Sequence, residues 1–440
     1  MAGGTFISQN KVRPGAYINF KSVSKPSGKV GVRGISTIPL ILGWGSADKL
    51  IDIDSSDLSD GKILDKLGYY GYEEEVISIK ECLKNSYKCI VFRLDSNGRK
   101  ATATISPLNI VAKYPGTVGN RISIIIKDLK NSKFEVITLL DTKTVDSQIA
   151  TNVEELLSND WVDFAGKGKL VANAGIKLTE GANGTVSNEN YSKYLELINN
   201  KVFNTMGVYT TDRSVKERIT SFIKQCREDK GKKVQCVLND YSDANYEGVI
   251  SVDQGYITKD EIIDVNGFVG YVTGLTSGAT LNQSNTYTVI PGAIEIKNPK
   301  TDDEIKEGIK AGKFIISFRQ DEKVVVETDI NTYTEISSSK SKEFCKNRVI
   351  RTLDDINNSI KNMFEQTYLG KMNNNDNGRT SFKSDIIAYL KELNKLGAID
   401  DFKNEDIVVS AGNDIDSVLV EIGVKPIDAM EKLYMTVSVG

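Results

Sequence analysis

Histidine is absent from all 440 residues of the sequence. Imidazole is the usual proton carrier near neutral pH, the usual base behind serine and cysteine nucleophiles, and a common metal ligand. Its absence excludes Ser-His-Asp and Cys-His catalysis and imidazole-based metal sites. We therefore expect no catalytic residue, no metal and no cofactor. An α/β hydrolase-like enzyme that works without histidine is the alternative.

The other common parts of an active site are also missing. No G-x-S-x-G motif occurs. The carboxylate pairs Asp302-Asp303 and Asp354-Asp355 lie in the first turn or on the face of predicted helices. The helix dipole or solvation accounts for carboxylates at such positions. These pairs therefore predict no acid-base chemistry.

Two stretches resemble ligand-binding loops but lack essential parts. Residues 373–378 place Asn373, Asn375 and Asn377 ahead of a glycine at the spacing of a calcium loop, yet the first position is not an acid and the twelfth is Ser384. Residues 308–313 resemble a phosphate loop that is one residue short and lacks Ser or Thr after the lysine. We interpret the first as a helix-connecting loop and the second as a helix end.

Cysteine is scarce. The five cysteines are odd in number and never reach metal-ligand spacing, which argues against a disulfide framework. We expect reduced thiols, with a bridge between the first two as the alternative. They are Cys82, Cys89, Cys226, Cys236 and Cys345.

The sequence also lacks long apolar runs and an excess of charge of either sign. No apolar run approaches 18 residues, and no basic stretch followed by an apolar one begins the chain, so neither a transmembrane helix nor a secretory signal is predicted. The 56 Lys and Arg nearly balance the 59 Asp and Glu, without a basic cluster among aromatics. We expect a soluble protein made in a cytoplasm, with no nucleic-acid partner and no membrane insertion.

Periodicity predicts several structural regions. Short alternating runs at 101–105, 122–127 and 133–140 predict a small antiparallel β domain. A strand over 202–209, a helix over 214–230 and a strand over 234–238 predict a parallel βαβ unit within an α/β domain. Further helices are expected over 59–67, 74–85, 147–157, 191–199 and 302–311, a strand over 88–94, and a hairpin over 314–319 and 323–328.

The C-terminal part carries two amphipathic helices, over 346–368 and 381–396, that we expect to pack against the terminal strands. Alternating residues predict strands over 416–424 and 430–440, and a similar pattern lies within 7–20. A terminal strand pairs either with its own fold or with another chain. We hypothesise that this chain builds a polymer by lending strands to its neighbours. The alternative is that both terminal strands pair within their own chain.

Seven stretches resemble contractile-tail sheath proteins of myophage-type tails. The stretches occur in the family's order, and the resemblance extends over nearly the whole chain. It is strongest to the short sheaths of prophage-like elements and phage-tail-like bacteriocins. The seven stretches are ISTIPLILGWG (35–45), AKYPGTVGN (112–120), SNTYTVI (284–290), IKAGKF (309–314), DINT (329–332), KNRVIRTLD (346–354) and YLGK (368–371).

The resemblance implies an α/β and α+β multidomain fold. It consists of a subtilisin-like α/β middle domain, a small antiparallel β domain, and a C-terminal α+β domain with extended N- and C-terminal arms. A subtilisin-like fold brings no protease activity by itself, because function lies in the site. The expected parts are an arm at 1–25, an N-terminal α/β part at 26–95, the β domain at 96–180, the α/β domain at 181–332, the C-terminal domain at 333–430 and an arm at 431–440.

By similarity, the arms add strands to the C-terminal sheets of neighbouring subunits. The implied protein is a structural subunit of a helical sheath around an inner tail tube, which contracts to drive the tube through a target envelope. The implied partners are other sheath subunits, the tube protein, and baseplate and tail terminator proteins; the chain would be made in a bacterial host and assembled in a phage or phage-like tail. The implied interface residues are Val12, Tyr17, Ile18, Phe20, Val418, Val420, Ile422, Leu433, Met435, Val437 and Val439.

Other classes fit less well. A surface-layer or adhesion protein is opposed by the missing signal peptide. A secretion-system sheath is commonly built from two chains, whereas this one carries both halves. The sequence does not separate a phage from a bacteriocin.

Overall fold

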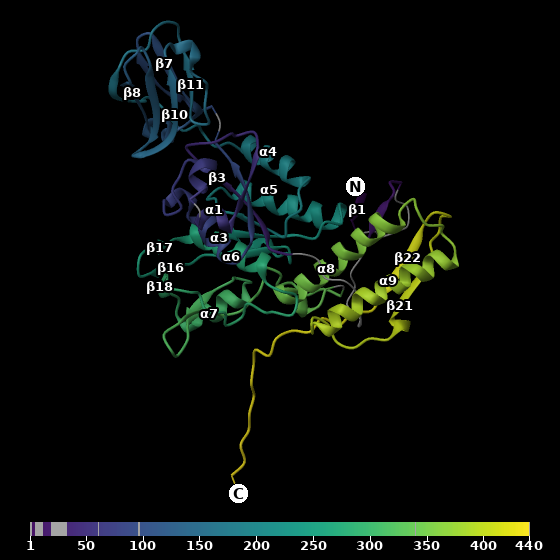
Figure 1. The fold of residues 1–440 in the computed structure, drawn as a ribbon. Coiled ribbons are helices and arrows are strands. Elements are labelled where there is room, and N and C mark those ends of the chain that lie inside the picture. Colours follow the sequence, from purple (N-terminus) through teal and green to yellow (C-terminus); the bar gives the residue numbers. More distant parts are fainter. Residues whose placement is uncertain are drawn as a thin grey trace. The chain divides into compact units, whose positions relative to one another are not determined.

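A computed structural model describes residues 2–4, 12–18, 33–59, 61–95, 97–338 and 340–439. These form two compact units (Figure 1). The larger comprises Met1–Thr37, Ser78–Cys89 and Val202–Gly440, and the smaller comprises Ile38–Ile77 and Ile90–Lys201.

A parallel sheet lies at the centre of the larger unit. Strand β13 (Thr205–Val208) pairs in parallel with β14 (Gln235–Asn239) on one side and with the first residues of β3 (Ile35–Leu40) on the other. Strand β15 (Val249–Val252) follows β14, again in parallel. All residues of β13, β14 and β15 are buried, as expected for a sheet covered on both faces. Helix α5 (Arg213–Lys224) connects β13 to β14, so the predicted βαβ unit is confirmed.

One helix of this unit was not predicted. Helix α6 (Val265–Gly278) is buried almost all round and so lacks the polar stripe that marks an amphipathic helix. Three glycines spaced by four residues bring it against helix α3 (Ile77–Leu83). A Cβ added at Gly274 would lie 2.0 Å from the Cys82 carbonyl oxygen, so the two backbones touch.

Smaller elements complete this part of the larger unit. The predicted hairpin and the predicted helix over 302–311 are confirmed, and the carboxylates of the Asp302-Asp303 pair are exposed in the first turn of that helix. The elements are β16 (Gly255–Thr258), β17 (Ile262–Ile263), β18 (Ala293–Lys297), α7 (Asp302–Lys310), β19 (Ile316–Phe318) and β20 (Val324–Val326).

The C-terminal region packs two helices against a hairpin. Helix α8 (Asn347–Met363) ends in a π-helical turn over Phe364–Tyr368, and α9 (Asp376–Lys395) begins earlier than predicted. Their buried residues form one cluster with the hairpin of β21 (Ile407–Ala411) and β22 (Val418–Ile422). The predicted packing of the helix pair against the strand at 416–424 is therefore confirmed.

The pair Asp354-Asp355 differs from the prediction. Each residue is only 5% exposed, so solvation does not account for them. Asp354 pairs with Arg227, and Asp355 accepts a hydrogen bond from the Tyr389 hydroxyl at 3.1 Å. The sequence interpretation was wrong here because the surface that covers this face of α8 is distant along the chain.

Antiparallel strands dominate the smaller unit, as predicted. They form two sheets, with the orders β10-β9-β8-β12 and β11-β7-β6. The strands are β6 (Lys100–Ile105), β7 (Leu108–Pro115), β8 (Ile122–Asp128), β9 (Phe134–Leu140), β10 (Lys143–Ala150), β11 (Val162–Ala165) and β12 (Asn173–Lys177).

The predicted helix over 147–157 is wrong. Residues up to Ala150 belong to β10, and only Val153–Glu155 forms a 3-10 turn. Strand β10 pairs along its length with β9, for example Ser147 with Ile137. The local sequence pattern of this segment is ambiguous, and cross-strand hydrogen bonds and packing determine that it forms a strand.

The remaining elements agree with the sequence more closely. Of the helix expected over 59–67, α2 (Ile63–Leu67) forms the second half, and α1 (Ser55–Ser59) ends at the residue where the prediction begins. Strands β4 (Leu50–Asp54) and β5 (Lys88–Arg93) are formed, and α4 (Asn188–Asn199) begins with a capping box. All five cysteines are free thiols. No helix within the described ranges is long and apolar enough to cross a membrane.

Candidate functional site

The hairpin of β21 and β22 has one face on the core and one in solvent. Its register pairs Ile407 with Ile422 and Val409 with Val420. Side chains alternate across a strand, and these four pack on the cluster formed by α8 and α9. Glu421, on the opposite face, is exposed. The apolar alternation visible in the sequence thus holds the hairpin on its own helices.

The outer edge of β22 presents backbone hydrogen-bonding groups. Two hydrogen bonds fix the pattern at the ends of the ladder: Gly412 N–H to Ser417 O and Gly423 N–H to Asp406 O, each at 2.9 Å. Bonded and non-bonded pairs alternate in an antiparallel ladder, so Val418, Val420 and Ile422 direct their N–H and C=O groups away from β21. In the described part of the chain, no third strand pairs with this sheet.

The three predicted interface residues of β22 therefore have two different roles. Their backbone groups lie on the open edge, while the side chains of Val420 and Ile422 pack on the helices. A strand that docks on this edge would meet their backbone and not their side chains. The sequence pattern identified the residues, but only the register shows which of their groups face outward.

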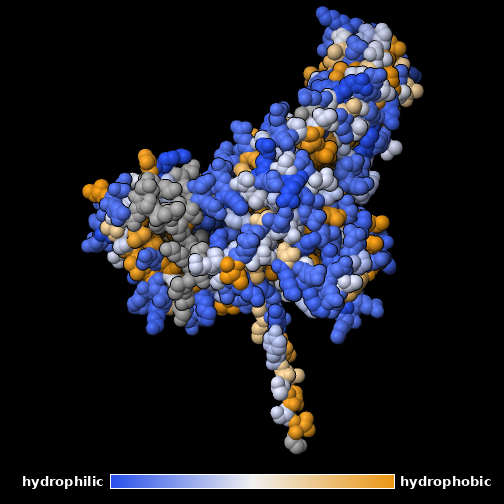
Figure 2. Space-filling model, turned by 180° about the vertical axis from the view of Figure 1, so that it is seen from behind, coloured by the Kyte–Doolittle hydropathy of each residue, from blue (hydrophilic) through white to orange (hydrophobic). Residues whose placement is uncertain are grey.

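The C-terminal segment 432–439 is exposed along its whole length and forms neither helix nor strand (Figure 1). Residues 430–439 therefore do not form the strand predicted over 430–440. The four predicted interface residues alternate along it and are 70–93% exposed. In Figure 2 hydrophobic side chains lie along this segment, with paler ones between them. They are Leu433, Met435, Val437 and Val439.

Glu431 attaches the start of this segment to the folded body. Its carboxylate accepts a hydrogen bond from the Thr286 hydroxyl at 2.7 Å and forms an ion pair with the ammonium group of Lys346. Lys346 also lies 3.9 Å from the carboxylate of Asp428. Burial raises the pKa of the neighbouring Cys345 thiol, which is therefore neutral near pH 7.

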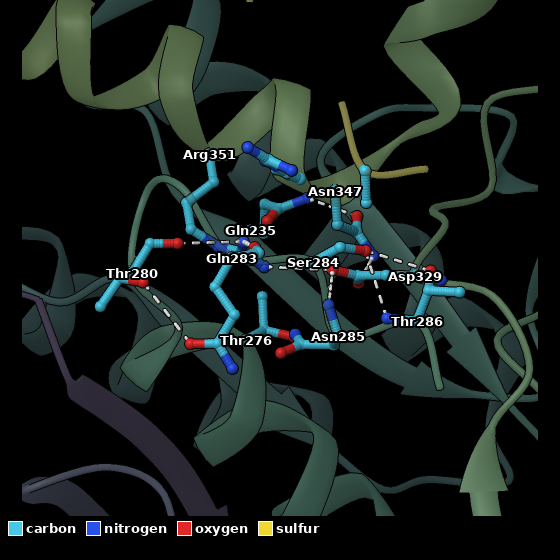
Figure 3. A network of polar contacts seen from close by, with 12 residues as sticks. Gln235, Thr276, Thr280, Gln283, Ser284, Asn285, Thr286, Asp329, Asn347 and Arg351 are labelled. Carbon is cyan, nitrogen blue, oxygen red and sulfur yellow. Dashed lines mark hydrogen bonds and ion pairs between the residues drawn. The ribbon is translucent and has the colours of Figure 1, made fainter. Parts of the chain in front are cut away.

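A buried polar network is linked to this attachment through Thr286 (Figure 3). The Asp329 carboxylate accepts hydrogen bonds from the Asn285 N–H at 3.0 Å and the Asn347 amide at 2.9 Å, and pairs with Arg351 at 3.3 Å. Arg351 and Asp329 have side chains 0% and 1% exposed. The Asp329 N–H donates to the Thr286 hydroxyl oxygen at 2.9 Å, so the network reaches the group that holds Glu431.

The N-terminal strands are short. Strands β1 (Ala2–Gly4) and β2 (Gly15–Tyr17) pair in parallel, and Ala16 is buried. Among the predicted interface residues, Val12 is 96% exposed, Tyr17 donates its hydroxyl proton to a backbone carbonyl at 2.8 Å, and Ile18 is half-buried. Phe20 lies outside the described residues.

The two loop-like motifs have structural roles. The Asn375 side chain caps α9 by accepting a hydrogen bond from the Gly378 N–H at 2.9 Å. Residues 308–313 close the end of α7, and Lys313 pairs with Asp253 at 2.9 Å. No cluster of three or more acidic or cysteine side chains suited to a metal occurs within the described ranges.

Comparison with known proteins places the chain in a family. It matches the phage tail sheath beta-sandwich domain over residues 96–183, the central domain over 184–332 and the C-terminal domain over 339–440. Phage-like element PBSX protein XkdK of Bacillus subtilis strain 168 is 30% identical, with 100% of each chain covered. The chain belongs to the phage tail sheath family.

Solved structures agree with this assignment. This chain is 38% identical to the sheath tail protein of Desulfitobacterium hafniense; the match covers 96% of this chain and 99% of that one, with a TM-score of 0.85. The anti-feeding prophage helical sheath in its contracted state has a TM-score of 0.57 over 97% of this chain and 99% of that one. At 12% identity, this second likeness shows the shared fold alone.

The family settles the broad class. A tail sheath protein is a structural component of the tail of a phage or phage-like particle, not an enzyme. Its fold is multidomain, α/β and rich in sheet.

Proposed function

We propose that this sheath subunit polymerises helically around an inner tail tube by exchanging strands with its neighbours, and that contraction of the sheath drives the tube through a target cell envelope. One observation carries the proposal: an open β edge at Val418–Ile422 and an exposed alternating segment at 432–439 occur in the same chain. The first can accept a strand and the second can supply one.

The small free energy of each strand contact is suited to an assembly of many subunits. A borrowed strand forms a handful of backbone hydrogen bonds, each with a net contribution of about 0.5 to 1.5 kcal/mol. One arm therefore adds only several kcal/mol, but the contacts of many subunits add together. Weak single links let an extended sheath assemble and rearrange. The energy of contraction would come from a metastable assembled state and new contacts between subunits.

The finer assignments belong to the same proposal. Residues 1–25 and 431–440 act as the two arms, with Val12, Tyr17, Ile18 and Phe20 in the first. Residues 181–332 form a subtilisin-like domain, supported by the parallel strands β13, β14 and β15 and the crossing helix α5. The partners are the tube, baseplate and tail terminator proteins, and synthesis takes place in the host cytoplasm.

The test is negative-stain electron microscopy of the purified full-length protein, alone and mixed with its tube partner. Hollow tubes with a helical lattice are expected. Truncation after Glu431 removes the donor segment, and Val418→Pro obstructs the acceptor edge at a position whose N–H faces outward. Both variants should remain folded by circular dichroism and form no tubes.

One outcome would contradict strand exchange. Normal sheaths from both variants would show that neither the segment nor the edge is needed. Unfolding of Val418→Pro removes that variant from the comparison, and the truncation then decides alone. Glu421→Gln, which changes an exposed side chain of β22 and leaves the backbone edge intact, is the matched control.

A further inference from the structure

We infer that Lys346, Thr286 and Glu431 form a clamp that fixes the residue at which the C-terminal segment leaves the folded body. The free segment then begins at Lys432. The importance of the clamp for assembly rests on the proposed strand exchange, whereas its existence can be tested in the isolated subunit.

A sharp contrast in exposure marks the position of the clamp. The side chain of Glu431 is 13% exposed, whereas Met430 and Leu433 on either side are 103% and 85% exposed. Every residue from 432 to 439 is exposed. Within residues 430–439, Glu431 is therefore the point of attachment.

Both groups that hold Glu431 belong to well-fixed parts of the molecule. Lys346 occupies the N-cap position of α8, and its N–H donates to the Glu343 carbonyl oxygen at 3.0 Å. Thr286 accepts the Asp329 N–H at 2.9 Å, next to the buried Arg351–Asp329 pair (Figure 3). The clamp therefore connects a free segment to the most buried ion pair of this region.

The clamp determines how far the segment reaches. Extended chain spans about 3.3 Å per residue, so residues 432–439 reach roughly 26 Å. The preceding fixed backbone group is the Ile427 N–H, which donates to the Ala398 carbonyl oxygen at 3.0 Å. Release of Glu431 would free residues 428–431 as well and lengthen the reach by roughly 13 Å.

The clamp also fixes register. A shift of one residue along a receiving strand exchanges the faces of all side chains. Leu433, Met435 and Val437 share one face, and a fixed start at Lys432 keeps that face in register with the acceptor. Glu431 is thus a positioning residue for the donated strand.

Hydrogen–deuterium exchange on isolated subunits tests the clamp. The variants are Lys346→Met, Glu431→Gln and the charge swap Lys346→Glu with Glu431→Lys. Loss of the ion pair should leave the Ile427 N–H hydrogen bond as the last attachment before the free end. That bond should then open more often, so exchange at the Ile427 amide becomes roughly three- to tenfold faster in both single variants. The charge swap should restore the wild-type rate.

Two controls separate a clamp from general destabilisation. Lys432→Met removes a lysine charge from the exposed neighbour of Glu431 and should leave exchange at Ile427 unchanged. Exchange within α8 and the thermal midpoint should stay at wild-type values in every variant. Equal Ile427 exchange in the wild type and both single variants would overturn the inference, as would faster exchange throughout α8.

The failure of this inference is distinguishable from the failure of the proposed function. Exchange in the isolated subunit does not depend on assembly, and tube formation by electron microscopy does not depend on Ile427. If Ile427 exchange responds as expected while truncation after Glu431 still gives normal sheaths, the clamp stands and strand donation fails.

Discussion

Arg227 and Asp354 form a buried, two-pronged ion pair, with Nη1 to Oδ2 at 2.6 Å and Nη2 to Oδ1 at 2.8 Å. Their side chains are 4% and 8% exposed. Arg227 lies in the π-helical turn that follows α5, and Asp354 lies in the middle of α8. Although 127 residues apart, they hold the C-terminal helix pair on the layer that covers the parallel sheet.

Removal of one partner from this pair should be costly. Arg227→Met leaves the Asp354 carboxylate buried without its cation, and such a loss costs about 3 to 5 kcal/mol. Urea unfolding should show this decrease in the free energy of unfolding. The double variant Arg227→Met with Asp354→Leu should recover most of the loss. Equal stability of the wild type and Arg227→Met would contradict the prediction.

The stability of the protein should depend on pH through Lys233. Burial, reinforced by repulsion from Arg227, lowers its pKa from 10.5 to about 8. Between these values the unfolded chain binds a proton that the folded chain does not, so stability rises with pH in this window. Lys233→Met removes this contribution. The wild type should gain up to about 3 kcal/mol relative to Lys233→Met between pH 7 and 10.5.

Urea unfolding of both proteins at several pH values measures the Lys233 effect. Only the difference between the two curves is diagnostic, because tyrosines also titrate near the upper limit of the range. Parallel curves across the window would show that Lys233 is not responsible.

Glycine is required where α6 meets α3. A Cβ at Gly274 would lie 2.0 Å from a backbone carbonyl oxygen, which cannot move without the helix. Gly274→Ala should therefore destabilise the protein by about 1 to 3 kcal/mol or more. At Gly308 in α7 the nearest atom is the end of the Ile315 side chain, at 2.4 Å, which can rotate. Gly308→Ala should cost less than about 1 kcal/mol, because alanine favours the helix. Thermal unfolding of both variants tests the contrast, and equal losses would contradict it.

The N-terminal arm should be needed for assembly but not for folding. Among residues 12–18 of this arm, the part whose burial the structure describes, Ala16 is the buried residue. On deletion of residues 1–25 we expect folded subunits by circular dichroism and no tubes by electron microscopy. Normal sheaths from this truncated protein would contradict a linking role for the arm.

Local periodicity predicted much of the fold. The stripe of α8 was recognised from spacing, and its residues Val349, Leu353 and Ile356 are buried. The same spacing did not reveal that polar residues of α8 are buried too, because their partners lie far away in sequence. Helix α6 was not predicted because it is apolar on every side and therefore lacks the alternation of apolar and polar faces that identifies an amphipathic helix. The four-residue spacing of Gly270, Gly274 and Gly278 was the available signal.

The candidate site also contains residues that the sequence identified and residues that only the structure revealed. The sequence identified the alternating residues at 418–422 and 433–439 as interface candidates. It did not identify the attachment of Glu431, because no local pattern distinguishes this acid from its exposed neighbours.

The sequence by itself determined that histidine chemistry is impossible, where the amphipathic helices and most strands lie, and which family the chain resembles. These properties depend on residue type and short-range spacing alone. The tertiary structure decided that β22 presents an open edge, that Asp354 is buried against Arg227, and that Glu431 holds the start of the free segment. Each of these depends on contacts between distant parts of the chain, and a contact of this kind forms only when the fold brings both partners together.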